Sequence, residues 1–210
     1  MSLGTHRLSV AAAFFAQGLL FIALTTRLPV TQARFDLNPT SLSLMLLMMV
    51  LLAGVGSLVA ERAAGRTSSG KILRISLIVA GLAVPVIAVA PTYATFLAAL
   101  GSYGTALGAI DATSNAQAVA VEHAYGRPIL PSFHGAWTSG GVIGAGLALA
   151  DPSLRAAVPL GLVALGVAGL GRFMPRAPIV DPEAVKVPLR PLLLVGAGLV
   201  LFYMVDTAAQ

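Results

Sequence analysis

The stretch "ISLIVAGLAVPVIAVAPTYATFLAALGSYGTALGAI", from Ile75 to Ile110, holds no charged residue. A helix rises about 1.5 Å per residue, and roughly 20 apolar residues are enough to cross the hydrocarbon layer of a bilayer. The stretch is therefore too long for one crossing. Its segment "APTYA", from Ala90 to Ala94, places a proline where a short turn would divide it. The stretch predicts two membrane helices joined by a tight turn.

The composition extends this prediction to the whole chain. Hydrophobic residues make up 57% and charged residues 10%, whereas about a quarter of the residues are charged in soluble domains. We therefore expect an integral membrane protein. The basic residues are scattered and never form a run, which argues against a nucleic-acid partner. With no cysteine, no metal-ligand cluster, no nucleophile elbow and no phosphate loop, we expect no cofactor, no metal and no enzyme activity.

Charged residues mark the ends of the other apolar segments. The first two expected spans are residues 8–26 and residues 37–60. The third and fourth are the two halves of the stretch above, and the fourth continues to about residue 121. The fifth and sixth are residues 131–150 and residues 156–171. They form a six-helix bundle over residues 1–171, followed by a proline-rich linker at residues 172–191. A seventh span begins near Leu192, in the segment 192–210. We interpret the chain as a fragment of a longer protein; the alternative is a complete seven-span protein.

The basic residues also predict an orientation. If the N-terminus is cytoplasmic, ten of the thirteen Lys and Arg residues fall on the cytoplasmic side, the linker included. The other three are Arg27, Arg34 and Arg155. Because cytoplasmic segments carry an excess of Lys and Arg, we expect a multi-pass protein with a cytoplasmic N-terminus.

Polar residues of the fourth span share one helix face with its glycines. Steps of three, four, three, four and seven join six residues: Gly101, Gly104, Gly108, Asp111, Asn115 and Glu122. Glycines on one face let a neighbouring helix approach closely, so the carboxylate of Asp111 should point into the bundle. A charged Asp near the bilayer centre costs about 2.5 to 3.5 kcal/mol, which calls for a compensating role.

Three interpretations of Asp111 stay open at this point. It can hold helices together by a hydrogen bond, it can gain and lose a proton as the bundle opens to each side, or it can bind a polar substrate or a cation directly. Asn115 lies one turn away and can share any of these roles. We expect Glu122 at the cytoplasmic interface, as a solvated or gating charge.

Three further residues are candidates for the wall of a cavity. Gln17 lies at the midpoint of the first span, where its amide needs a partner, either on another helix or on a substrate. His134 and Trp137 open the fifth span near the expected cytoplasmic face. Either can contact the substrate, although Trp also favours a membrane interface for its amphipathic ring alone.

The loop expected after the second span reads "GSLVAERAAGRTSSGKILR", from Gly56 to Arg74. It contains a small residue, an acid, two arginines and a glycine at fixed spacing: Ser57, Glu61, Arg62, Gly65 and Arg66. We expect this charge cluster to act as a conformational latch at a cytoplasmic helix junction.

This loop resembles the signature loop of the major facilitator superfamily (MFS) of secondary transporters, Gly-x-x-x-Asp-Arg-x-Gly-Arg. Here Ser57 replaces the first glycine, Glu61 replaces Asp, and one extra residue precedes Gly65. The stretches "RLPV", "GAIDATSNAQAVAVEHAYGRP" and "SFHGAWTSGGVIGAG" resemble a bacterial branch related to the fucose:proton symporters. The resemblance covers the N-terminal six-helix half and the start of the second half.

The resemblance implies a twelve-helix, all-α transporter whose central polar cavity opens alternately to the two sides of the inner membrane. Asp111 matches the acid on helix four, which takes part in proton coupling in those relatives, and Asn115 matches the amide four residues after it. The symporters also use an acid on helix one, and the first span here has none. The implied partners are the lipid bilayer, the missing C-terminal half, protons and a small polar solute such as a sugar or a related metabolite.

Two other functions remain open. A drug or metabolite efflux antiporter of the superfamily would carry a Gly-Pro motif on helix five, which the glycines from Gly140 to Gly146 lack. A non-transporting membrane scaffold or sensor would use Asp111 only to hold helices together.

Overall fold

The computed structural model describes residues 3–170 and residue 194. The chain divides into two compact units, Met1–Ile179 and Val180–Gln210, and the account below concerns residues 3–170 of the first. The expected linker at residues 172–191 and the expected seventh helix, apart from Leu194, lie outside the described residues.

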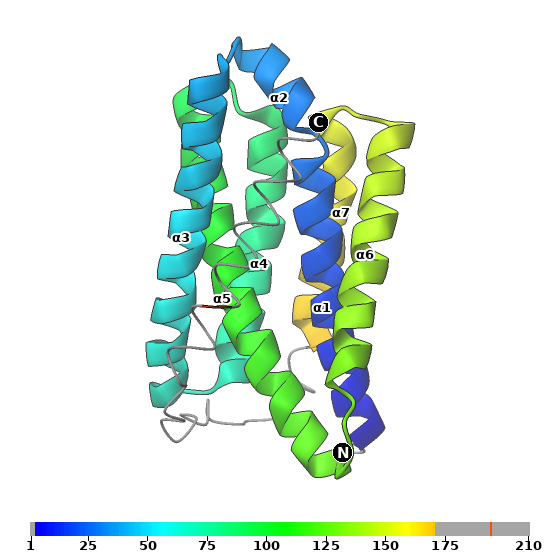
Figure 1. The fold of residues 1–210 in the computed structure, drawn as a ribbon. Coiled ribbons are helices and arrows are strands. Elements are labelled where there is room, and N and C mark those ends of the chain that lie inside the picture. Colours follow the sequence, from blue (N-terminus) through cyan, green and yellow to red (C-terminus); the bar gives the residue numbers. More distant parts are fainter. Residues whose placement is uncertain (1–2, 171–193, 195–210) are drawn as a thin grey trace. The chain divides into compact units, whose positions relative to one another are not determined.

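Every regular element in residues 3–170 is helical (Figure 1). The order is α1 (Leu3–Thr25), α2 (Leu28–Phe35), α3 (Pro39–Arg66), α4 (Ser69–Val89), α5 (Tyr93–Tyr125), α6 (Leu130–Ala150), the 3-10 helix η1 (Leu154–Ala157) and α7 (Val158–Gly169). The prediction of an all-helical chain is confirmed for this part of the molecule.

The opening stretch folds as two helices. α4 ends at Val89 and α5 begins at Tyr93, so the turn lies at the predicted proline. The hydroxyl of Thr92 accepts a hydrogen bond from the backbone N–H of Thr95 (3.2 Å) and caps the start of α5. α5 ends where Gly126 adopts the left-handed conformation with φ 66°, which glycine reaches without steric cost.

Four helices are long and apolar enough to cross a membrane: α1, α3, α4 and α5. They correspond to the first four predicted spans. α6 has 21 residues, but its first half carries His134, Trp137, Thr138 and Ser139, and α7 has only 12 residues after η1. The fifth and sixth crossings therefore stay predictions, although both segments are helical.

Two features differ from the sequence-based expectation. The connection after α1 contains the short helix α2, whose eight residues are too few to show a clear apolar period. The expected loop from Gly56 to Arg74 is mostly helix, because α3 continues to Arg66 and α4 begins at Ser69. The alanine-rich, proline-free segment before Arg66 favours this continuation.

Helix α5 packs between α3 and α4, while α1 packs on α6, α5 and α7 (Figure 1). The glycine face of α5 lies against a neighbouring helix, as predicted, and that helix is α3. A Cβ atom at Gly104 would lie 2.8 Å from the carbonyl oxygen of Met49, and one at Gly108 would overlap the backbone of Ala53. In the same way, a Cβ at Gly18 of α1 would overlap the backbone of Trp137 in α6. Close backbone approach thus fixes both helix pairs.

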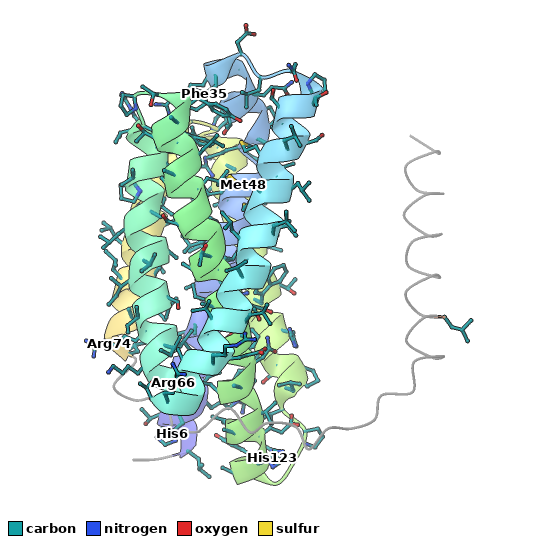
Figure 2. The ribbon with its side chains drawn as sticks, turned by 90° about the vertical axis from the view of Figure 1, so that its left-hand side faces the viewer. His6, Phe35, Met48, Arg66, Arg74 and His123 are labelled. Carbon is teal, nitrogen blue, oxygen red and sulfur yellow. The ribbon has the colours of Figure 1, made fainter. Side chains whose placement is uncertain are left out.

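The two ends of the bundle differ in charge. Figure 2 shows His6, Arg66, Arg74 and His123 at one end and Phe35 at the other. The N-terminus, the α3–α4 turn and the α5–α6 turn therefore share an end, as the alternating crossings predict. Which side of the membrane this end faces stays a prediction.

Arg27 lies at the opposite end and is completely buried. Its guanidinium donates hydrogen bonds to three carbonyl oxygens: that of Ala23 (2.7 Å), that of Asp151 (2.8 Å) and that of Ser153 (2.8 Å). The first lies in the last turn of α1, and the other two follow α6. One side chain therefore ties the end of α1 to the α6–α7 connection.

Arg34 closes another helix end in a similar way. Its guanidinium donates to the carbonyl oxygens of Ala88 (2.9 Å) and Ala90 (2.6 Å), at the C-terminus of α4. A cation is favoured there because the last carbonyls of a helix carry partial negative charge. Of the three basic residues expected outside the cytoplasm, Arg27 and Arg34 thus have structural roles.

Replacing Arg27 by lysine is expected to lower the free energy of unfolding by about 2 kcal/mol. A single ammonium keeps the charge but cannot reproduce the planar fork that reaches three carbonyls. The measurement is thermal unfolding of the full-length protein in detergent. Arg155→Lys, at an exposed position of η1, is the matched control, and equal midpoints for the two variants would contradict this role.

Candidate functional site

A cavity of about 620 Å³ opens between four helices of the bundle. Its walls come from α1, α3, α5 and α6. The lining residues are Phe14, Gln17, Phe21, Val50, Ala53, Gly54, Ser57, Leu107, Gly108, Asp111, His134 and Trp137. Five of the predicted site residues therefore share one cavity: Gln17, Ser57, Asp111, His134 and Trp137.

Asp111 forms the central polar contact of this cavity. Its side chain is exposed, and its Oδ1 accepts a hydrogen bond from Nε2 of Gln17 (3.0 Å). Gln17 itself is only 6% exposed. The Gln17 amide was expected to bond either to another helix or to a substrate, and the structure shows a bond to another helix. The bond joins the middle of α1 to α5.

The glycine face of α5 explains why Asp111 reaches the cavity. Gly108 lies one turn earlier and permits the backbone of α3 to approach α5 at Ala53. Beyond this contact the face opens, and the next residue on it is Asp111. Small residues of α3, Ala53 and Gly54, leave the space in front of the carboxylate.

Asn115 supports Asp111 from the same helix. Its Nδ2 donates to the backbone carbonyl oxygen of Asp111 (2.9 Å) and lies 3.5 Å from its Oδ1. The second distance is at the limit of a hydrogen bond. Asn115 is absent from the cavity lining, so its predicted contact with substrate stays a prediction.

His134 and Trp137 come from the first half of α6. Phe14 of α1 packs edge-on against the ring of His134, with 5.4 Å between centroids. Phe21 of α1 packs against Trp137, with 6.3 Å between centroids. The wall opposite α3 is therefore aromatic, and it places a ring that can titrate, His134, in the same cavity as the carboxylate.

The cavity lining contains one acidic side chain and no Lys or Arg. A carboxylate in such surroundings can bind a proton, attract a cation or accept hydrogen bonds from hydroxyl groups. The described part of the chain contains no cluster of three or more His, Cys, Asp or Glu that could hold a metal ion. The cavity thus offers a carboxylate, an imidazole and a hydroxyl group to a bound polar molecule.

The expected latch lies at the end of α3. Ser57 lines the cavity, while the charged members of the motif are exposed further along the helix, toward its C-terminal end. Nη1 of Arg62 donates to the carbonyl oxygen of Leu58 in its own helix (3.2 Å). Within residues 3–170 no ion pair joins Glu61 to Arg62 or Arg66, so the latch stays a prediction.

Glu122 has a different role from the one expected. It is half-buried, and its Oε2 accepts hydrogen bonds from the backbone N–H groups of Ile129 (2.7 Å) and Leu130 (2.6 Å). α6 begins at Leu130, so Glu122 caps the start of this helix from the end of α5. The expectation of a solvated charge was wrong, because the first N–H groups of a helix attract a carboxylate. A gating role for Glu122 stays a prediction.

Replacing Glu122 by glutamine is expected to lower the free energy of unfolding by about 1 kcal/mol. The amide oxygen can still accept a hydrogen bond, but the favourable charge at the helix N-terminus is lost. Thermal unfolding of the full-length protein measures the change. Glu61→Gln, at an exposed carboxylate, should have no effect, and a similar loss in both variants would contradict the capping role.

The sequence prediction named Trp137 and His134 but missed the two phenylalanines of the site. Phe14 and Phe21 flank Gln17 at steps of three and four residues, so they share its helix face. Because Gln17 was predicted to line the cavity, this spacing indicated that both phenylalanine rings line it too. Apolar residues in an apolar helix carry no other mark.

The chain is similar in sequence to two proteins that are named as transporters. It is 37% identical over 146 residues, 68% of its length, to an uncharacterized MFS-type transporter of Yersinia pestis. It is 31% identical over 140 residues, 65% of its length, to an uncharacterized transporter of Sinorhizobium fredii. No protein-family model matches the chain.

The chain spans only 37% and 36% of the length of these two relatives. Both are named as transporters, and neither is named as an enzyme. Together with its apolar helices, the similarity identifies a multi-pass membrane protein with one relative that is named as an MFS-type transporter.

Proposed function

We propose that the chain is the N-terminal part of a secondary active transporter of the major facilitator type, related to the fucose:proton symporters. In such proteins two halves enclose a site near the middle of the membrane and rock around it, so that the site opens to one side at a time. The observation that carries the proposal is the carboxylate of Asp111, exposed in a cavity between membrane helices and bonded to Gln17.

Asp111 is the proposed proton-coupling group. An ionisable residue inside a membrane bundle is expensive to insert and marks a transport path or a proton relay. Here it faces a cavity from which a proton can reach it. His134 lines the same cavity and is the second candidate for proton exchange.

The proposed substrate is a small polar solute such as a sugar or a related metabolite. The carboxylate of Asp111 and the hydroxyl of Ser57 can form hydrogen bonds with hydroxyl groups, and Trp137 offers a flat apolar face. We place the protein in the inner membrane with its N-terminus in the cytoplasm, since basic residues gather at that end of the bundle. Glu61, Arg62 and Arg66 at this end are the proposed latch.

A structural role is the second candidate function. The Gln17–Asp111 hydrogen bond joins α1 to α5, as expected in a membrane scaffold or sensor that moves no solute. Efflux of a drug or metabolite is a further alternative. In the same assay it would appear as solute movement in the direction opposite to the proton gradient.

The test uses the full-length protein in proteoliposomes with an imposed pH gradient. Labelled sugars and related polar metabolites are added to the external solution, which is either acidic or neutral. We expect accumulation of one solute class that depends on the gradient and collapses when a protonophore is added. If no solute of any class moves in either direction, the scaffold interpretation replaces the transporter.

A further inference from the structure

The amide oxygen of Gln17 is a buried acceptor that the carboxylate of Asp111 cannot serve. Within the described residues, Oε1 of Gln17 is shielded from solvent and has no hydrogen-bond partner. Buried polar atoms in proteins are almost always paired, and an unpaired acceptor destabilises the fold. The amide nitrogen of the same side chain donates to Oδ1 of Asp111 at 3.0 Å. Half of the amide is therefore satisfied and half is not.

A neutral carboxylic acid completes this arrangement, because an acid and a primary amide form two hydrogen bonds side by side. The amide N–H donates to one acid oxygen, and the acid O–H donates to the amide oxygen. We propose that Gln17 pairs with Asp111 in both protonation states, and that its Oε1 accepts the hydrogen bond from the proton that Asp111 takes up. This inference rests on the proposed function only in that Asp111 binds a proton.

The proton reaches Asp111 from water on the cavity side and binds to Oδ2, while Oδ1 keeps its hydrogen bond from Nε2 of Gln17. A rotation of the two planar groups then directs the O–H toward Oε1. No other bond forms or breaks, and the carboxyl group loses its negative charge.

The surroundings of Asp111 offer few competing partners. The residues of α3 that line the cavity carry no titratable group, and α1 contributes Gln17 between two phenylalanines. His134 of α6 is the other titratable residue in the lining, and Asn115 of α5 approaches the carboxyl group at 3.5 Å. Gln17 supplies the shortest side-chain contact and the buried acceptor.

The pairing has a consequence for the bundle. Gain of a proton changes the charge of the cavity wall without releasing α1 from α5. The two helices can then move as one rigid unit whether the site is charged or neutral, as rocking of a whole half requires. A leucine in place of Gln17 would leave both states of Asp111 without this link.

Infrared difference spectroscopy of the full-length protein between high and low pH tests the proposal without measuring transport. Protonation of Asp111 produces a carboxylic-acid C=O band, which Asp111→Asn removes and so assigns. In Gln17→Leu we expect this band at higher wavenumber, because the acid group has lost two hydrogen bonds. In Gln17→Glu, whose protonated form also offers one donor and one acceptor, the band should return toward its original position.

Gln32→Leu is the matched control, since Gln32 lies in α2, away from the cavity, and its amide donates to the backbone carbonyl oxygen of Leu37. Its spectrum should equal that of the unmodified protein. An assigned Asp111 band that stays in place in Gln17→Leu would overturn the pairing and leave proton binding intact. A spectrum with no band that depends on Asp111 would instead overturn the proposed proton binding, and the pairing with it.

Discussion

Replacing Asp111 by asparagine is expected to reduce uptake driven by a pH gradient to the level of protein-free liposomes. Asparagine has the shape of the protonated acid but cannot release a proton. It can still form a hydrogen bond with Gln17, so the α1–α5 contact and the fold should persist. The loss therefore falls on coupling and not on stability. The measurement is accumulation of labelled solute by the full-length protein in proteoliposomes.

The same variant should keep exchange of labelled for unlabelled solute when no gradient is applied. Exchange needs the cavity to open to both sides, but it needs no net release of protons. Asp36→Asn is the matched control. Asp36 is exposed and ends α2 with φ 50°, a left-handed conformation that asparagine tolerates well. Intact pH-driven uptake in Asp111→Asn would contradict the coupling role and leave the hydrogen bond to Gln17 as the function of the residue.

Much of the fold could be predicted because it depends on residues close together in the sequence. The charge-free run from Ile75 to Ile110 and the proline at its centre indicate two helices and the turn between them, since length and hydropathy decide where a helix can cross. The shared face of Gly108 and Asp111 follows from helix geometry alone. These are properties of single helices.

Contacts between distant segments could not be predicted in the same way. The hydrogen bond from Gln17 to Asp111 depends on how far α1 is shifted and rotated against α5, and the packing of Gly18 on α6 helps to set that position. Arg27 donates to backbone carbonyl oxygens in the connection after α6, and Glu122 accepts from backbone N–H groups at the start of α6. Their sequence neighbours give no sign of this, because backbone donors and acceptors have no residue signature.

Replacing Gly108 by alanine is expected to lower the free energy of unfolding by about 3 kcal/mol or more. A Cβ atom there would overlap the carbonyl oxygen of Ala53, and the next nearest atoms also belong to the backbone of α3. A flexible side chain could turn aside, whereas a helix backbone must move as a whole. α3 would shift away from α5 and carry Ala53 and Gly54 out of the cavity wall, so transport should fall together with the thermal unfolding midpoint.

Two further variants separate this backbone clash from other effects of the substitution. Gly146→Ala in α6 is the matched control, because a Cβ there meets no atom within 4 Å. It should keep or raise the unfolding midpoint, since alanine favours a helix over glycine by about 0.8 to 1.0 kcal/mol. Combining Gly108→Ala with Ala53→Gly should not restore stability, because the overlapping atom is a carbonyl oxygen that glycine retains. Recovery in the double variant would show that side-chain crowding, and not close backbone approach, joins α3 to α5.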